Sequence, residues 1–68
     1  MTTTEHMVAG YTHLFAGDLI DKWTYYATVF HQMDRGRITL TRICELADPI
    51  IPPAVMRMRR RDYLNGAL

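Results

Sequence analysis

The sequence predicts an all-α protein with one small domain. Three observations lead to this prediction. Apolar residues recur at intervals of three and four residues through the first half of the chain. Residues typical of helix starts precede the apolar stretches, and glycines or prolines follow them. A chain of 68 residues has room for one hydrophobic core. We therefore expect a single domain over 1–68, with a helical dimerisation segment at 1–35 and a hairpin of two helices at 36–68.

The segment at 1–35 has the signals of a long helix. Thr2 and Glu5 have the spacing of a capping box, in which each side chain accepts from the backbone N–H of the other residue. Gly36 can adopt the left-handed conformation that often follows a last helical turn. Between these ends, apolar residues fall on successive core positions of a heptad repeat: Ala16, Leu19, Trp23, Tyr26, Phe30 and Met33.

Gly10 and Gly17 leave open whether this helix is continuous. A glycine inside a helix costs about 1 kcal/mol relative to Ala, and Asp18 could cap a new helix after Gly17. The alternatives are one helix about 45 Å long, or two helices at about 5–15 and 18–35. A compact domain of this length has a radius of gyration of only about 11 Å. An unbroken helix would therefore need a second chain to cover it.

A short second helix is predicted after Gly36. Thr39 can cap it, and a helical stripe of apolar residues follows: Leu40, Ile43, Cys44 and Ala47. A strand is the alternative, because apolar and polar residues alternate over 38–41. Alternation over so short a segment is weaker evidence than the helical stripe. Pro49 ends the helix, since the residue before a proline avoids the helical conformation.

The last helix is expected over about 54–64. Pro52 or Pro53 suits its first position, and Asn65 with Gly66 closes it. On a helical wheel, Val55 and Met58 share the face that we expect in the core. The basic residues lie nearly opposite: Arg57, Arg60 and Arg61.

The aromatic residues of the first half exceed what two short helices can cover. Tyr25 and Tyr26 are about 100° apart on a helix, so we expect that they cannot both point to the centre of one narrow apolar face. Tyr and Trp are favoured at protein interfaces, because each combines a large apolar area with a polar group. An ordinary monomeric core is the alternative. The predicted homodimer interface comprises Leu19, Trp23, Tyr26, Phe30 and Met33.

Residue types and spacings argue against catalysis. The three histidines lack metal-ligand spacing, there is no glycine-rich phosphate loop, and Cys44 lies on an apolar stripe, where a thiol is usually inert. We expect no enzyme, cofactor, metal or small-molecule substrate. No apolar run approaches the roughly 18 residues of a membrane span, and the first residues lack the positive charge of a signal peptide. We therefore expect a cytoplasmic protein without membrane contact.

Charge is distributed unevenly along the chain. Residues 1–34 contain one lysine and four acidic residues, a net charge of −3, whereas residues 35–68 contain seven arginines and three acidic residues, a net charge of +4. An acidic half and a basic half suggest electrostatic complementarity, either within a dimer or toward a partner.

Residues 39–66 resemble helix-turn-helix segments of small phage proteins, such as terminase small subunits and excisionase-like regulators. The resemblance lies in the short helix at 40–45, the proline-containing turn and the arginines of the last helix. It implies a recognition helix that would contact DNA. The chain departs from the pattern in its longer turn and in having no Asn, Gln, Ser or Thr over 54–64 to contact base edges. In size and helical make-up the chain is also similar to phage-encoded antagonists of host regulators, including quorum-sensing anti-activators.

Two functions follow from these patterns. The first is a non-catalytic regulatory protein that binds and inhibits a host protein, such as a transcriptional activator or a motor ATPase. The second is a helix-turn-helix DNA-binding regulator. Met, Tyr and Arg are enriched at protein interfaces, and the same arginines could contact phosphates and bases. For either partner the predicted binding residues are Ile50, Ile51, Arg57, Met58, Arg60, Arg61 and Tyr63.

Overall fold

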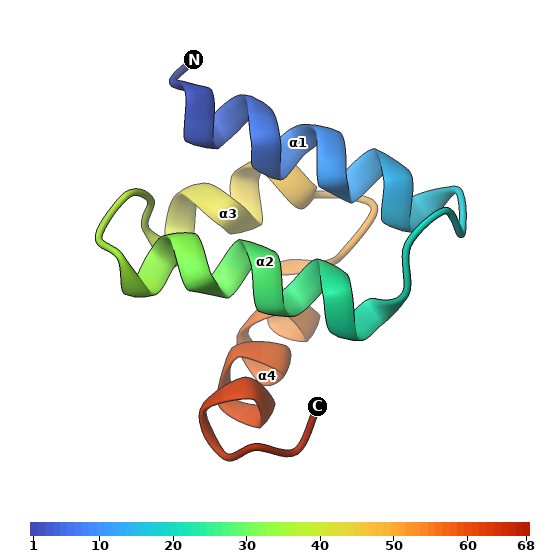
Figure 1. Ribbon diagram of the computed structural model, residues 1–68, viewed down its shortest axis with the longest axis vertical. Coiled ribbons are helices and arrows are strands. Elements are labelled where there is room, and N and C mark those ends of the chain that lie inside the picture. Colours follow the sequence, from blue (N-terminus) through green and yellow to red (C-terminus); the bar gives the residue numbers. More distant parts are fainter.

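The structure, a computed structural model, describes all 68 residues and contains four helices and no strand: α1 (Thr3–Ala16), α2 (Lys22–Asp34), α3 (Leu40–Ala47) and α4 (Pro53–Leu64). In Figure 1, α1 and α2 lie side by side, α3 packs behind them, and α4 projects from the lower side of α2. The all-α prediction is confirmed. The single long N-terminal helix is wrong, because the first helix has only 14 residues.

A turn at 17–21 separates α1 from α2, as the alternative with a break near Gly17 predicted. Asp18 has a left-handed backbone with φ of 58°. Asp21, rather than Asp18, caps α2, and its side chain accepts a 2.7 Å hydrogen bond from Thr24 N–H. The turn reverses the chain, so α2 folds back along α1. The heptad positions before and after Gly17 therefore do not form one continuous seam.

The other expected helix caps are confirmed. Thr2 and Glu5 form the capping box, with bonds of 3.1 and 2.7 Å, and the Thr39 side chain accepts from Arg42 N–H at 3.1 Å. Gly36 and Gly66 have φ of 72° and 69°. Such left-handed positions suit glycine, which has no Cβ to clash with the backbone.

The core lies where all four helices meet. Tyr25 and Tyr26 are 0% and 3% exposed, so the chain itself covers both rings, which the sequence did not lead us to expect. α2 has neighbours on two sides, α1 and α4, and therefore two tyrosines about 100° apart can both be buried. The buried apolar side chains are Val8, Tyr25, Tyr26, Val29, Phe30, Ile38, Ile43, Cys44, Ala47, Ile51 and Met56.

The core face of α4 differs from the prediction. Met56 is fully buried, whereas Met58 is 40% exposed. Two positions along a helix differ by about 200°, so the helix is turned away from the expected orientation. The inward stripe of α4 instead carries Met56, Arg59, Arg60 and Tyr63. Arg59 lies over the Tyr26 ring, Arg60 lies over the Phe30 ring, and Tyr63 packs against Phe30.

Candidate partner-binding surface

Arg60 belongs to the packing between α2 and α4. Its guanidinium carbon lies 5.5 Å from the ring centroids of both Phe30 and Tyr63, and Nη2 donates a 2.6 Å hydrogen bond to Asp34. This bond holds the pKa of the Asp34 carboxyl below its ordinary value. The Arg60 side chain is only 14% exposed. The sequence placed Arg60 on an outward binding face, and the structure corrects that prediction.

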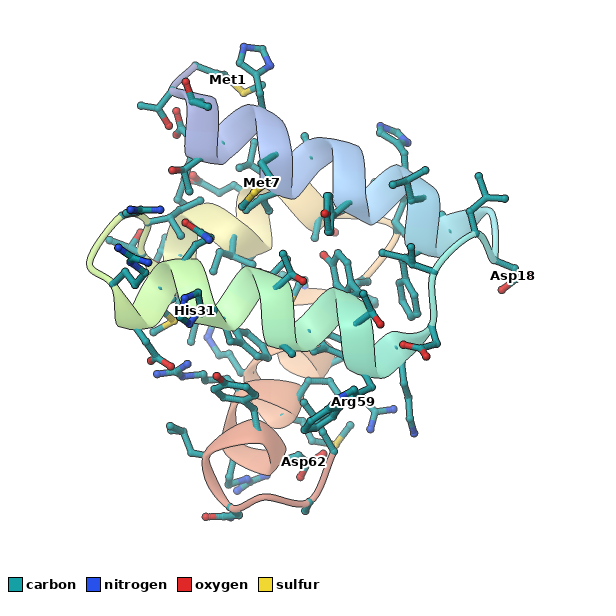
Figure 2. All side chains as sticks on the ribbon, in the orientation of Figure 1. Met1, Met7, Asp18, His31, Arg59 and Asp62 are labelled. Atoms are coloured by element: carbon teal, nitrogen blue, oxygen red, sulfur yellow. The ribbon has the colours of Figure 1, made fainter.

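Arg59 is also held within the chain. It lies over the Tyr26 ring, 5.8 Å from the centroid, and pairs with Asp62 at 3.6 Å. Figure 2 shows Arg59 and Asp62 along the same side of α4, below α2. Burial raises the pKa of the Tyr26 hydroxyl, and the nearby Arg59 charge opposes this effect. Neither Arg59 nor Arg60 can leave these contacts without uncovering an aromatic ring.

The other two arginines of α4 remain exposed. Arg57 and Arg61 form no ion pair and no hydrogen bond through their side chains. They are four residues apart, so their side chains lie on one face of the helix. Met58 and Leu64, 40% and 64% exposed, lie on the same side. We call this surface the α4 outer stripe: Ala54, Arg57, Met58, Arg61 and Leu64.

The remaining predicted binding residues divide between core and surface. Ile51 is 4% exposed and part of the core, and Tyr63 is half-buried against Phe30. Ile50 is 42% exposed in the turn before α4. Of the predicted binding residues, Ile50, Arg57, Met58 and Arg61 are therefore exposed, the last three within the α4 outer stripe.

The predicted dimer residues also divide. Tyr26 and Phe30 are buried within their own chain and Met33 is half-buried, so the two rings cannot contact a second chain in this fold. Leu19 and Trp23 are 73% and 52% exposed. The sequence placed all five on one seam because it treated the segment as a single amphipathic helix. The presence of α4 on the second side of α2 covers the inner members.

Arg42 forms an ionic contact that the sequence did not reveal. Its Nε donates a 2.5 Å hydrogen bond to Glu5, and Nη1 donates to Glu45 at 3.3 Å. The bond from Thr2 N–H and the contact with Arg42 lower the pKa of Glu5 to about 2. This contact joins the first turn of α1 to α3. Glu5 and Arg42 are far apart in sequence, so spacing could not pair them.

A shallow hollow of about 400 Å³ lies beside α2, lined by Ala27, Thr28, His31, Gln32 and Tyr63. Figure 2 shows His31 at this outer side of α2. No three His, Cys, Asp or Glu side chains lie close enough together to hold a metal ion. No helix has both the length and the apolar content needed to cross a membrane.

Comparisons with known proteins give no relative for this chain. No family model, no curated protein and no solved structure matches it. Function is therefore inferred from the geometry and chemistry of the chain itself.

Proposed function

We propose that this protein is a non-catalytic regulator that binds and inhibits another protein through the α4 outer stripe. The observation that carries the proposal is the mixture of side chains on that stripe. Two free guanidiniums flank Met58, and Leu64 extends the apolar surface. Arg and Met are among the residue types enriched at protein interfaces, and Met adapts to partners of different shape.

Charge inside the chain favours a protein partner over DNA. Asp34 and Asp62 already neutralise Arg60 and Arg59, which leaves two free arginines on α4. Phosphate contacts supply most non-specific affinity for DNA, and exposed Met58 adds nothing to them. A protein surface with carboxylates beside apolar side chains would satisfy both parts of the stripe.

The inhibitory role follows from size. A small chain without a catalytic constellation acts by occupying a surface of its target. The similarity to small phage-encoded antagonists supports a host transcriptional activator or motor ATPase as the class of target, in the cytoplasm.

Capture from nuclease-treated bacterial lysate tests this proposal. The wild-type chain should retain a specific protein, and Met58→Glu or Arg61→Glu should release it, because each places a new carboxylate in the stripe. Arg35→Glu is the matched control, since Arg35 is exposed at the end of α2, outside the stripe and in no ion pair. Equal capture by all four chains would contradict the proposal.

A DNA-binding regulator is the second candidate, and the observation that favours it is the position of Arg57 and Arg61 on the exposed side of the second helix in the α3–α4 hairpin. Duplex binding through two to four phosphates should weaken with salt, with a log–log slope of roughly −2 to −4. A gel-shift salt series that gives this slope would favour DNA over a protein partner, provided that Arg57→Glu abolishes the duplex binding.

A further inference from the structure

Helix α4 carries similar side chains on two opposite faces, and only one of these faces is covered. The inner face holds a methionine, two arginines and a large side chain in the last turn: Met56, Arg59, Arg60 and Tyr63. The α4 outer stripe repeats this composition: Met58, Arg57, Arg61 and Leu64. Met56 is fully buried, whereas Met58 and Leu64 are 40% and 64% exposed. The covered face therefore shows what kind of surface such a set of side chains binds.

Helix α2 meets the inner face with two aromatic rings and one carboxylate. Arg59 lies 5.8 Å from the centroid of the Tyr26 ring, and Arg60 lies 5.5 Å from that of Phe30. Arg60 also donates a 2.6 Å hydrogen bond to Asp34. The three groups on α2 are spaced four residues apart, so they form one line along that helix. A helix with two aromatic residues followed by an acid thus satisfies the inner arginines.

The outer arginines have no such partner within the chain. Neither Arg57 nor Arg61 forms an ion pair, and no acidic residue lies three or four positions from either along α4. The two are themselves four residues apart, and like charges at this spacing destabilise a helix. A carboxylate supplied by another molecule would relieve this repulsion.

We propose that the α4 outer stripe binds a helix of the regulated protein that carries the same line of side chains as α2, namely two aromatic residues and an Asp or Glu at successive spacings of four. Guanidinium groups stack on aromatic rings and bind carboxylates through paired N–H donors. The stripe from Ala54 to Leu64 is about 15 Å long, which matches about three turns of a facing helix. This inference rests on the proposed function, because it specifies the partner of the same stripe.

A synthetic peptide tests the proposal on the full chain. The probe is a helical peptide of about 15 residues, with two phenylalanines and one aspartate at successive spacings of four on an alanine and glutamine background. Methionine-methyl NMR should show the exposed Met58 shifting on titration while the buried Met56 stays in place. Replacing the aspartate by lysine should weaken binding at least about tenfold, because this cation faces the arginines. No shift of Met58 at about 1 mM peptide, or equal binding of both peptides, overturns the proposal.

Charge reversal on the chain tests which arginines select the acid. Arg57→Glu with Arg61→Glu should invert the preference, so that the lysine peptide binds more tightly than the aspartate peptide. The control is Arg35→Glu with Arg37→Glu, which changes the net charge equally at two exposed positions outside the stripe. This control should keep the wild-type preference. The same inversion in the control would show that net charge alone governs binding and would overturn the assignment.

A second pair of variants separates ring stacking from charge. Arg57→Lys with Arg61→Lys keeps both positive charges but removes the planar guanidinium groups. It should bind the aspartate peptide more weakly than the wild type and still prefer it to the lysine peptide. A peptide with both phenylalanines replaced by serine should lose binding to the wild type. Undiminished binding of the serine peptide would contradict the role given to the aromatic rings.

Two further outcomes separate this inference from the proposed function. If a DNA duplex shifts Met58 and displaces the peptide, the stripe binds phosphates and the inference falls. If the chain captures a protein from lysate that the aspartate peptide does not displace, the inhibitory role stands and only the aromatic–acidic helix is wrong. Peptide binding without any captured protein would support the chemistry of the stripe and contradict the regulatory role.

Discussion

Tyr25 has a polar group within the core of the molecule. Its hydroxyl lies 2.7 Å from Thr12 Oγ1, and the Thr12 hydroxyl in turn donates to the Val8 carbonyl at 2.8 Å. The ring stacks on Phe15 with centroids 4.9 Å apart. The Thr12 contact satisfies an oxygen that would otherwise be buried without a partner. A neighbour on α1 therefore makes a tyrosine acceptable at this core position.

Tyr25 should make the protein sensitive to alkali. Burial raises the pKa of its hydroxyl to about 12, against an ordinary value of 10.0. The unfolded chain thus loses this proton first, and stability should fall as pH rises from 10 toward 12. Tyr25→Phe should reduce that fall and cost about 0.5–1.5 kcal/mol near neutral pH. Urea unfolding at several pH values measures both, and identical pH profiles would contradict the assignment.

Met56 and Met58 give a direct test of the orientation of α4. Met56→Ala should lower the free energy of unfolding by about 2–5 kcal/mol, because the side chain is fully buried. Met58→Ala should change it by about 0.5 kcal/mol or less, as expected for an exposed position. Equilibrium denaturation of both variants makes the comparison. The reverse order would support the core face of Val55 and Met58 that the sequence predicted.

At the scale of elements, α2 connects α1 to α4. It contacts α1 on one side and α4 on the other, and its two ends are held differently. Asp21 caps the first turn, whereas Asp34 in the last turn binds Arg60 of α4. The contacts of α2 with Arg59 and Arg60 explain why these two of the four arginines of α4 are unavailable to a partner. α3 is joined to α1 by the contact between Glu5 and Arg42.

The charge of Glu5, which accepts from Thr2 N–H and pairs with Arg42, should affect stability as pH falls. The pKa of Glu5 is lowered from 4.5 to about 2, so the unfolded chain binds this proton first. The stabilisation is therefore present above about pH 4.5 and is lost as pH falls toward 2. Thermal unfolding of wild type and Glu5→Gln should differ near neutral pH and converge in acid. A constant difference across this range would show that the charge of Glu5 does not contribute.

At the scale of the whole molecule, the fold covers far more aromatic surface than the sequence led us to expect. The radius of gyration is 10.8 Å, close to the value for a compact domain. Tyr25, Tyr26 and Phe30 are fully covered by one chain. Trp23 is the aromatic ring that stays half-exposed. Any surface shared with another molecule consequently excludes these three rings and is smaller than a heptad seam.

Trp23→Ala should have a small effect on the monomer. Because half of the side chain is exposed, we expect a loss of about 1 kcal/mol or less in the free energy of unfolding at low protein concentration. Phe30→Ala, which removes a buried ring, should cost about 3–5 kcal/mol. Denaturation followed by circular dichroism compares them. A loss of several kcal/mol for Trp23→Ala would mean that the indole belongs to the core.

Local signals in the sequence determined where α1 and α3 begin and where α2 ends. Thr2, Thr39 and Gly36 act on backbone groups only three or four residues away, so short sequence patterns suffice to predict them. The apolar stripe of α3 was predicted for the same reason. Only the tertiary structure determined which side of α4 is buried, which rings are covered and which arginines remain free. Those outcomes depend on contacts such as that between Asp34 and Arg60, 26 residues apart, and no periodicity along one helix encodes the helix that packs against it.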